Sequence, residues 1–223
     1  MESFVLNAIS GVTHGFGILH EPILTFARTH WHTRPMKTQV HGVNIAIATE
    51  NRQQVGPADG WYTEKRNILL TLVNADCYPV LFSRKDGTAI AALHVGWRGA
   101  FNGIIYNLKE IINNQGDDLA NWVAGIGPGA MPCCYEVSQE LIDAFSDRYP
   151  INPESLNPQP RKLNLLAVIT HQLRDIGITC FDSLSLCTIC SVDINAQGET
   201  HPIFHSYRRD GNKEVQVSAI MML

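Results

Sequence analysis

The chain has 223 residues, of which 45% are hydrophobic and 17% are charged, as in an ordinary globular domain and unlike a disordered or fibrous chain. Its formal charge of −4, with no run of like charges, argues against a nucleic acid or an anionic membrane as partner. The N-terminus lacks the basic start and apolar stretch of a secretory signal, and no apolar run reaches the about 18 residues of a membrane span. We therefore expect a cytoplasmic protein, whose six cysteines are reduced thiols or metal ligands.

Short apolar runs predict buried β-strands at residues 67–74, 89–94 and 122–124. Each run ends where polar or glycine-rich sequence begins.

Three segments have the apolar spacing of an amphipathic helix. They cover residues 104–112, just after Gly99; residues 137–145, with Ser138 as N-cap and Pro150 beyond the end; and residues 165–176, stopped by Gly177. Residues 152–160 carry three prolines and no apolar period, which predicts a surface loop. The irregular alternation of strands and helices favours an α+β fold over a doubly wound sheet.

Three segments contain candidate metal ligands, namely His41, Cys77 and His94. Cys77 and His94 lie at or just beyond the ends of expected strands, so their side chains converge if those strands are neighbours. Two imidazoles and one thiolate suit zinc, and three protein ligands leave a fourth position for water or substrate. The ligands are 36 and 17 residues apart and match no compact metal motif. Packed or capping roles for the same three side chains therefore remain an alternative.

Six motifs in a fixed order extend this pattern over most of the chain from residue 39 onward. They resemble those of the laccase-domain family, also described as multicopper polyphenol oxidoreductase-like or purine nucleoside phosphorylase proteins. The motifs are Gln-Val-His-Gly at 39–42, Ala-Asp-Gly at 58–60, Ala-Asp-Cys-Tyr-Pro-Val at 75–80, His-Val-Gly-Trp-Arg-Gly at 94–99, Gly-Pro at 127–128 followed by Cys-Cys-Tyr-Glu-Val at 133–137, and Phe-His-Ser-Tyr-Arg-Arg at 204–209.

The resemblance implies mixed β-sheets flanked by helices in an α-β-β-α layering, expected here as a single domain of residues 1–223. It also implies a zinc site at His41, Cys77 and His94. The implied activities are phosphorolysis of adenosine, inosine and 5′-methylthioadenosine, with deamination of adenosine, so the expected partners are a nucleoside and phosphate. Copper is the less favoured metal, because a blue copper and a trinuclear cluster would need more imidazoles than nine histidines supply.

Residues beside the expected metal suggest further roles. Asp76 is a candidate acid or base, and an equal alternative is that it orients a histidine ligand. Arg98, Arg208 and Arg209 are candidates for binding phosphate, because a guanidinium can donate two parallel hydrogen bonds to this anion. For each arginine, a structural ion pair is the competing interpretation.

Cys187 and Cys190, followed by His201 and His205, have the Cys-x2-Cys and His-x3-His spacings of a zinc finger. Only ten residues separate Cys190 from His201, fewer than the about 12–15 of such fingers, so we do not expect a finger here. The adjacent cysteines at 133 and 134 are interpreted as reduced thiols packed in a turn rather than a strained bridge.

The chain departs from the family pattern at its N-terminus, where the usual arginine is missing and the segment before residue 39 is abbreviated. Asn164 also stands where many members have aspartate. Two rival functions follow. One is a zinc or cysteine hydrolase of a peptidoglycan precursor, with Cys77 as nucleophile and His94 as base. The other is a metal-binding protein that has lost catalysis.

Overall fold

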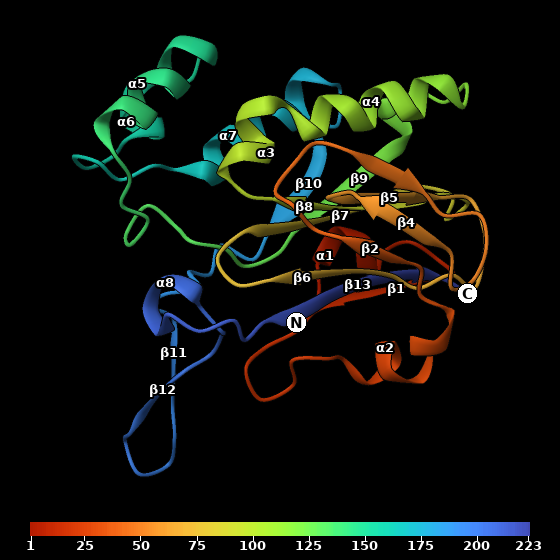
Figure 1. Cartoon of the computed structure of the whole chain (residues 1–223), viewed down its shortest axis with the longest axis horizontal. Coiled ribbons are helices and arrows are strands. Elements are labelled where there is room, and N and C mark those ends of the chain that lie inside the picture. The colour runs from red at the N-terminus through yellow and green to blue at the C-terminus, as the bar shows by residue number, and fades with distance from the viewer.

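Two β-sheets lie face to face in the computed structural model, which describes residues 1–223 (Figure 1). The strands are β1 (Val12–Phe16), β2 (Met36–Thr38), β3 (Ile45–Ile47), β4 (Gln54–Pro57), β5 (Gly60–Thr63), β6 (Leu70–Asn74), β7 (Tyr78–Arg84), β8 (Ile90–Val95), β9 (Trp122–Ile126), β10 (Cys180–Ser183), β11 (Val192–Ile194), β12 (Thr200–Pro202) and β13 (Gln216–Met222). The helices are α1 (Phe4–Asn7), α2 (Thr25–Thr29), α3 (Trp97–Asn102), α4 (Ile104–Asn114), α5 (Gln139–Arg148), α6 (Pro153–Leu156), α7 (Leu165–Asp175) and α8 (Tyr207–Asp210), with 3₁₀ turns η1 (Trp31–Thr33) and η2 (Leu119–Asn121).

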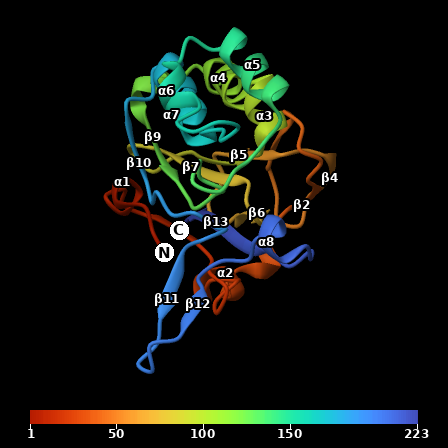
Figure 2. The same cartoon turned by 90° about the vertical axis from the view of Figure 1, so that its left-hand side faces the viewer.

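The larger sheet has six strands in the order β10-β9-β7-β8-β5-β3, with parallel pairs at both edges and antiparallel pairs between them. The smaller sheet is antiparallel, in the order β1-β13-β6. Helices α3 to α7 cover the outer face of the larger sheet, and α2 lies on the far side of the smaller one (Figures 1 and 2). The predicted α+β class and α-β-β-α layering are therefore confirmed.

The central strands β7 and β8 are buried on both faces, which explains why their sequences are continuously apolar. In β7, Val80 and Phe82 pack in the core beneath the helices, whereas Leu81 packs in the core between the two sheets. In β8, Leu93 faces the helices and Ala92 faces the smaller sheet. A helical segment could not divide its side chains between two opposite layers in this alternating way.

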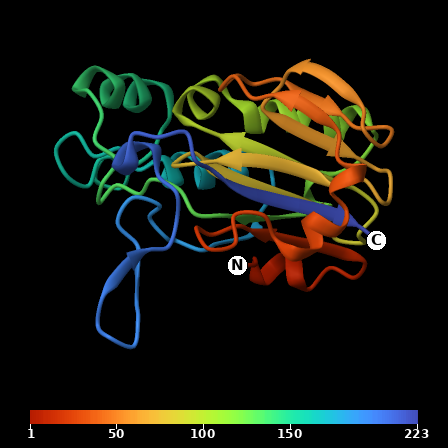
Figure 3. The same ribbon diagram turned by 60° about the horizontal axis from the view of Figure 1, so that its bottom comes forward.

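The three expected strands are present as β6, β8 and β9, each within a few residues of the predicted bounds. Strand β7 and the C-terminal strand β13 were not predicted from the sequence. Strand β13 lies alongside β6 in the middle of the smaller sheet, where Figure 3 shows it in blue beside the yellow strand. Its neighbours come from residues 12–16 and 70–74, so its place depends on partners far away in the sequence.

The expected helices are also present. Ser138 caps α5 by accepting a hydrogen bond from the backbone N–H of Leu141, and Gly177 follows α7 with a φ of 98°. The helix expected at residues 104–112 is α4, but α3 precedes it, and the two are separated by Gly103 with a φ of 85°. This left-handed glycine ends one helix and starts the next.

The prediction of a loop at residues 152–160 is wrong for its first half. Asn152 caps the short helix α6, in which Pro153 occupies the first turn and Leu156 is buried. Proline is compatible with that position because the first N–H groups of a helix have no intrahelical partner. Asn164 likewise serves as N-cap of α7, so asparagine performs a capping role at this departure from the family pattern.

No helix of the structure combines the length and the apolar character needed to cross a membrane.

Candidate functional site

His41, Cys77 and His94 converge on one point although 53 residues separate the first from the last in sequence. Their potential ligand atoms all lie within 4.8 Å of one another. The two imidazole rings meet edge to face, with their centroids 4.9 Å apart and their planes at 68°. The group is therefore compact enough for all three side chains to contact one metal ion.

Strand pairing brings Cys77 to His94, but through different strands from those expected. The preceding strand β6 belongs to the smaller sheet and is not hydrogen-bonded to β8. Instead, Cys77 immediately precedes β7, whose Pro79 is paired with His94 of β8. The prediction that the two side chains converge is correct. They converge because β8 pairs with β7, a strand that was not predicted from the sequence.

The buried carboxylate of Asp59 holds both histidines in place. Its Oδ1 lies 2.9 Å from Nδ1 of His94 and accepts a hydrogen bond from the backbone N–H of His41, also at 2.9 Å. Its Oδ2 accepts from the N–H groups of Gly42, at 2.7 Å, and Val40, at 3.2 Å. Because Nδ1 of His94 is engaged by the carboxylate, Nε2 is the nitrogen left to bind a metal.

His41 has a positive φ of 60°, which is unusual for a residue with a side chain. The three consecutive N–H groups that Asp59 binds hold the loop in this conformation. Asp59 lies in the Ala-Asp-Gly motif at residues 58–60, whose local sequence does not indicate this role. Its function depends on contacts 17 to 35 residues away in the chain.

Gly96 leaves room for two of the candidate ligands. A Cβ at this position would lie 2.8 Å from Sγ of Cys77 and 3.2 Å from Cδ2 of His41. Both separations are shorter than ordinary van der Waals contact. Since Gly96 has a φ of −82°, which any residue can adopt, only the space requires glycine here.

The protonation states in the metal-free chain follow from burial and hydrogen bonding. Burial raises the pKa of Asp59, but hydrogen bonds from His94, Gly42 and Val40 outweigh it and lower the pKa to about 2. Burial lowers the pKa of His94, against the opposing effect of Asp59. Burial and the nearby carboxylates of Asp76 and Asp59 raise the pKa of Cys77 to about 12. At neutral pH this leaves an ionised Asp59, a neutral imidazole and a protonated thiol.

A pocket of about 450 Å³ opens beside the three candidate ligands. It lies at the end of the sandwich, where β6, β8 and the segment before β13 meet. Aromatic side chains from three separate segments contribute to its wall, namely Trp97 of α3, Tyr135 of the loop after β9 and Tyr207 of α8. Two cationic residues, Arg208 and Lys213, also line it. The pocket therefore combines flat apolar surfaces with positive charge next to the candidate metal ligands.

Asp76 lines this pocket, but its side chain is hydrogen-bonded to neither histidine. Its Oδ1 accepts a hydrogen bond from the hydroxyl of Thr188 at 2.7 Å, and its Oδ2 accepts one from the backbone N–H of Arg208 at 2.8 Å. Asp59, not Asp76, is the carboxylate that orients His94. Asp76, which directly precedes Cys77, is thus hydrogen-bonded to two segments that are distant in sequence, at Thr188 and at Arg208.

The three candidate arginines lie in different surroundings. Arg208 lines the pocket, donates to the carbonyl of Glu136 and lies over the ring of Tyr135. Arg98 is exposed, is not among the residues lining the pocket, and packs over the ring of Trp97 at 4.7 Å. The guanidinium of Arg209 is fully engaged, because it donates to Asp210 and to the carbonyls of Thr188, Ile189 and Phe204.

We predict that Gly96→Ala weakens zinc binding by about tenfold or more while the chain still folds. The added methyl group must displace Cys77 or His41, and overpacking of this kind costs about 1–3 kcal/mol. Gly56→Ala is the matched control, since a Cβ there meets nothing within 4 Å. Competition with a chromogenic chelator measures both affinities. Equal affinity in the two variants would show that Gly96 does not shape the site.

We also predict that Asp59→Asn lowers zinc affinity 10- to 100-fold, the usual effect of losing a group that orients a metal ligand. The amide offers one acceptor oxygen to four donors and carries no charge to favour the His94 N–H. Asp147→Asn, at an exposed position on α5, is the control. The same chelator competition applies, and wild-type affinity in Asp59→Asn would contradict the orienting role.

Comparison with known proteins places these features in a family. The family model described as multi-copper polyphenol oxidoreductase laccase matches residues 24–223. A protein named purine nucleoside phosphorylase from Rickettsia conorii is 36% identical over 144 residues, which cover 63% of this chain and 59% of that protein. One of the same name from Haemophilus influenzae is 27% identical over 188 residues, covering 82% of this chain and 72% of that protein. The matched stretch thus spans about three fifths of the length of the Rickettsia relative.

Among solved structures, the hypothetical protein YfiH of Bacillus licheniformis has the same fold, with a TM-score of 0.81 and 24% sequence identity. The alignment covers 95% of this chain and 92% of that one. The family match extends over most of the sequence and includes all three candidate metal ligands and the pocket around them. The chain therefore belongs to the multi-copper polyphenol oxidoreductase laccase family, several of whose relatives are named purine nucleoside phosphorylase.

Proposed function

We propose that the protein is a zinc-dependent purine nucleoside phosphorylase acting on adenosine, inosine and 5′-methylthioadenosine, with deamination of adenosine as a side activity. The observation that carries the proposal is the convergence of His41, Cys77 and His94 beside a pocket with aromatic and cationic walls. The relatives named purine nucleoside phosphorylase support the same class of enzyme.

The donor set fits zinc. One sulfur and two imidazole nitrogens are ligands that this ion accepts in tetrahedral geometry, and three protein ligands leave one position open. Asp59 supplies the outer hydrogen bond that zinc-bound histidines commonly make. When bound, zinc supplies Lewis-acid polarisation and lowers the pKa of water towards 7. Copper remains the less favoured alternative for the same residues.

The pocket walls suit the two halves of a phosphorolysis substrate pair. Trp97, Tyr135 and Tyr207 offer faces on which a purine base can stack. Arg208 and Lys213 offer positive charge to phosphate, which would otherwise be costly to place beside a leaving purine. In the reaction, a phosphate oxygen forms a bond to the ribose carbon C1′ as the bond to the purine nitrogen breaks. The purine leaves with that electron pair and takes up a proton.

Asp76 is the proposed acid or base for this proton, since its carboxylate lies in the pocket wall next to Cys77. It also holds the backbone of Arg208, so it positions the proposed anion site. Arg98 is proposed as a second phosphate-binding group, because it packs over Trp97, which lines the pocket. Arg209 was expected beside phosphate, but its guanidinium donors are engaged by Asp210 and three carbonyls. We propose that it supports the wall instead.

A second candidate function is a cysteine hydrolase, favoured by the Asp59–His94 pair next to Cys77. The raised pKa of Cys77, about 12, weighs against it, because a nucleophilic cysteine needs a lowered pKa. Coordination to zinc would favour the thiolate form of Cys77, whereas no cationic side chain is hydrogen-bonded to its sulfur. The zinc enzyme is therefore the better-supported function.

The function is tested by release of hypoxanthine from inosine with and without phosphate. We expect cleavage that needs phosphate, yields ribose 1-phosphate, stops after zinc is removed by a chelator and returns when zinc is added. Phosphate-independent release of free ribose would indicate a hydrolase instead. No turnover of inosine or adenosine by fully zinc-loaded protein would support a metal-binding protein without this activity.

We further predict that Arg208→Ala slows phosphate-dependent inosine cleavage at least tenfold, equivalent to about 1.4 kcal/mol, while zinc content stays unchanged. The reason is the loss of the guanidinium that lines the pocket. Arg98→Ala should also slow cleavage, mainly by raising the KM for phosphate. Arg174→Ala, another exposed arginine packed over an aromatic ring, is the control. Deamination of adenosine, which uses no phosphate, should be less affected. A wild-type phosphate requirement and rate in Arg208→Ala would place the anion elsewhere.

A further inference from the structure

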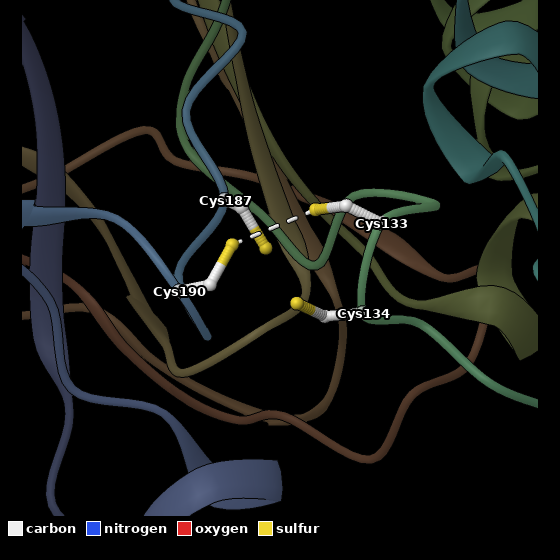
Figure 4. Close-up of side chains that lie close together, drawn as sticks. All are labelled: Cys133, Cys134, Cys187 and Cys190. Atoms are coloured by element: carbon white, nitrogen blue, oxygen red, sulfur yellow. Dashed lines mark hydrogen bonds between the residues drawn. The ribbon is translucent and has the colours of Figure 1, made fainter.

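Four of the six cysteines form a second cluster, separate from the pocket. Cys133 and Cys134 lie in the turn that follows β9, and Cys187 and Cys190 lie in the loop between β10 and β11. Figure 4 shows their side chains pointing towards a common centre from these two segments. All four Sγ atoms lie within 4.8 Å of one another. His201 and His205, which complete a finger-like pattern in the sequence, lie near Glu199 and Glu214 instead.

The two segments are joined by backbone contacts. Gly129 and Cys187 form a parallel β-bridge, in which the N–H of Thr188 donates to the carbonyl of Gly129 at 3.1 Å. The N–H of Ser191 donates to the carbonyl of Cys187 at 3.0 Å and closes the turn that contains both of its cysteines. The guanidinium of Arg209 holds the same turn through the carbonyls of Thr188 and Ile189.

Ordinary packing does not account for this arrangement. Free cysteine normally behaves as a small buried hydrophobe. Here Cys133 and Cys190 are exposed, Cys134 is half-buried, and only Cys187 is buried. Four thiols gathered at a surface bury little apolar area, so the cluster requires another explanation.

The sulfur separations match a single tetrahedral metal ion. Sγ of Cys133 and Sγ of Cys190 are 3.6 Å apart. A disulfide would bring two sulfurs to about 2.05 Å. Four sulfurs at about 2.3 Å from one zinc ion are about 3.8 Å from each other in a regular tetrahedron. A cluster of several iron atoms would hold its thiolate ligands farther apart, because the inorganic core lies between them.

We propose that Cys133, Cys134, Cys187 and Cys190 bind a structural zinc ion. Soft thiolates select zinc over harder cations, and four protein ligands close the coordination sphere, as in structural sites. The ion would cross-link two loops that are more than 50 residues apart in sequence.

The site would also brace the wall of the pocket. Thr188, next to Cys187, donates to the carboxylate of Asp76, and Ala130 of the other loop donates its N–H to the carbonyl of Asp76 at 2.8 Å. Both halves of the cysteine cluster are thus attached to the residue that precedes Cys77. Loss of the ion would loosen Asp76 without removing any residue of the first site.

The experiment measures zinc per chain in purified wild-type protein and in single variants. We expect Cys190→Ser and Cys133→Ser each to carry about one zinc ion fewer than wild type, with a lower melting temperature. Cys180→Ser, which changes an exposed cysteine outside the cluster, should keep the wild-type zinc content. His94→Ala should lose the ion of the first site alone, so failure of either site is recognised separately.

Cobalt substitution supplies a readout that does not depend on the folding of a cysteine variant. In His94→Ala, which leaves the four cysteines intact, bound Co²⁺ should show the intense thiolate charge-transfer and visible bands of a tetrahedral four-sulfur site. The proposal is overturned if this variant binds no cobalt with those bands. It is also overturned if Cys190→Ser keeps the full zinc content, or if mass spectrometry of unreduced wild-type protein shows these cysteines as disulfides.

Discussion

The site depends above all on one buried carboxylate. Asp59 is fully buried and accepts hydrogen bonds from three consecutive backbone N–H groups and from the ring of His94. A buried charge without such partners would be very costly, so the loop at residues 40–42 and the histidine are as necessary to the carboxylate as it is to them. This mutual requirement fixes a loop of unusual backbone conformation against the end of a rigid strand. The imidazole of His94 and the backbone of His41 are thereby set in position before any metal binds.

The position of the pocket follows from the way in which the two sheets end. Strands β7 and β8 contribute side chains to the cores on both of their faces, and Cys77 and His94, at the ends of these strands, line the pocket. The segment before β13 and the short helix α8 also line it, with polar and aromatic side chains. The candidate site thus lies where the packing of the sandwich gives way to loops: His94 belongs to β8, Cys77 immediately precedes β7, and His41 lies in the loop between β2 and β3. Such an arrangement combines a rigid scaffold with a surface that can differ among relatives.

The elements that sequence reasoning found are those whose signal is local. Ser138 caps α5 and Gly177 ends α7, because a cap or a left-handed glycine acts on its own turn of helix. Strand β13 and the role of Asp59 were missed because each depends on partners distant in sequence. Cys187 shows the same limit. Its spacing suggests a partnership with the downstream histidines, whereas two of the three cysteines that gather around it lie more than 50 residues upstream.

Asp76 connects the two groups of potential metal ligands. It precedes Cys77, has a φ of 84°, and binds Thr188 through its side chain and Ala130 through its carbonyl. A residue with this strained φ persists only where surrounding contacts determine its conformation, and here those contacts come from the two loops that carry the four-cysteine cluster and from the backbone N–H of Arg208. A closed metal site in these loops would supply rigidity, and an open site at His41, Cys77 and His94 would supply reactivity. The hydrogen bonds of Asp76 are then the physical link through which the first supports the second.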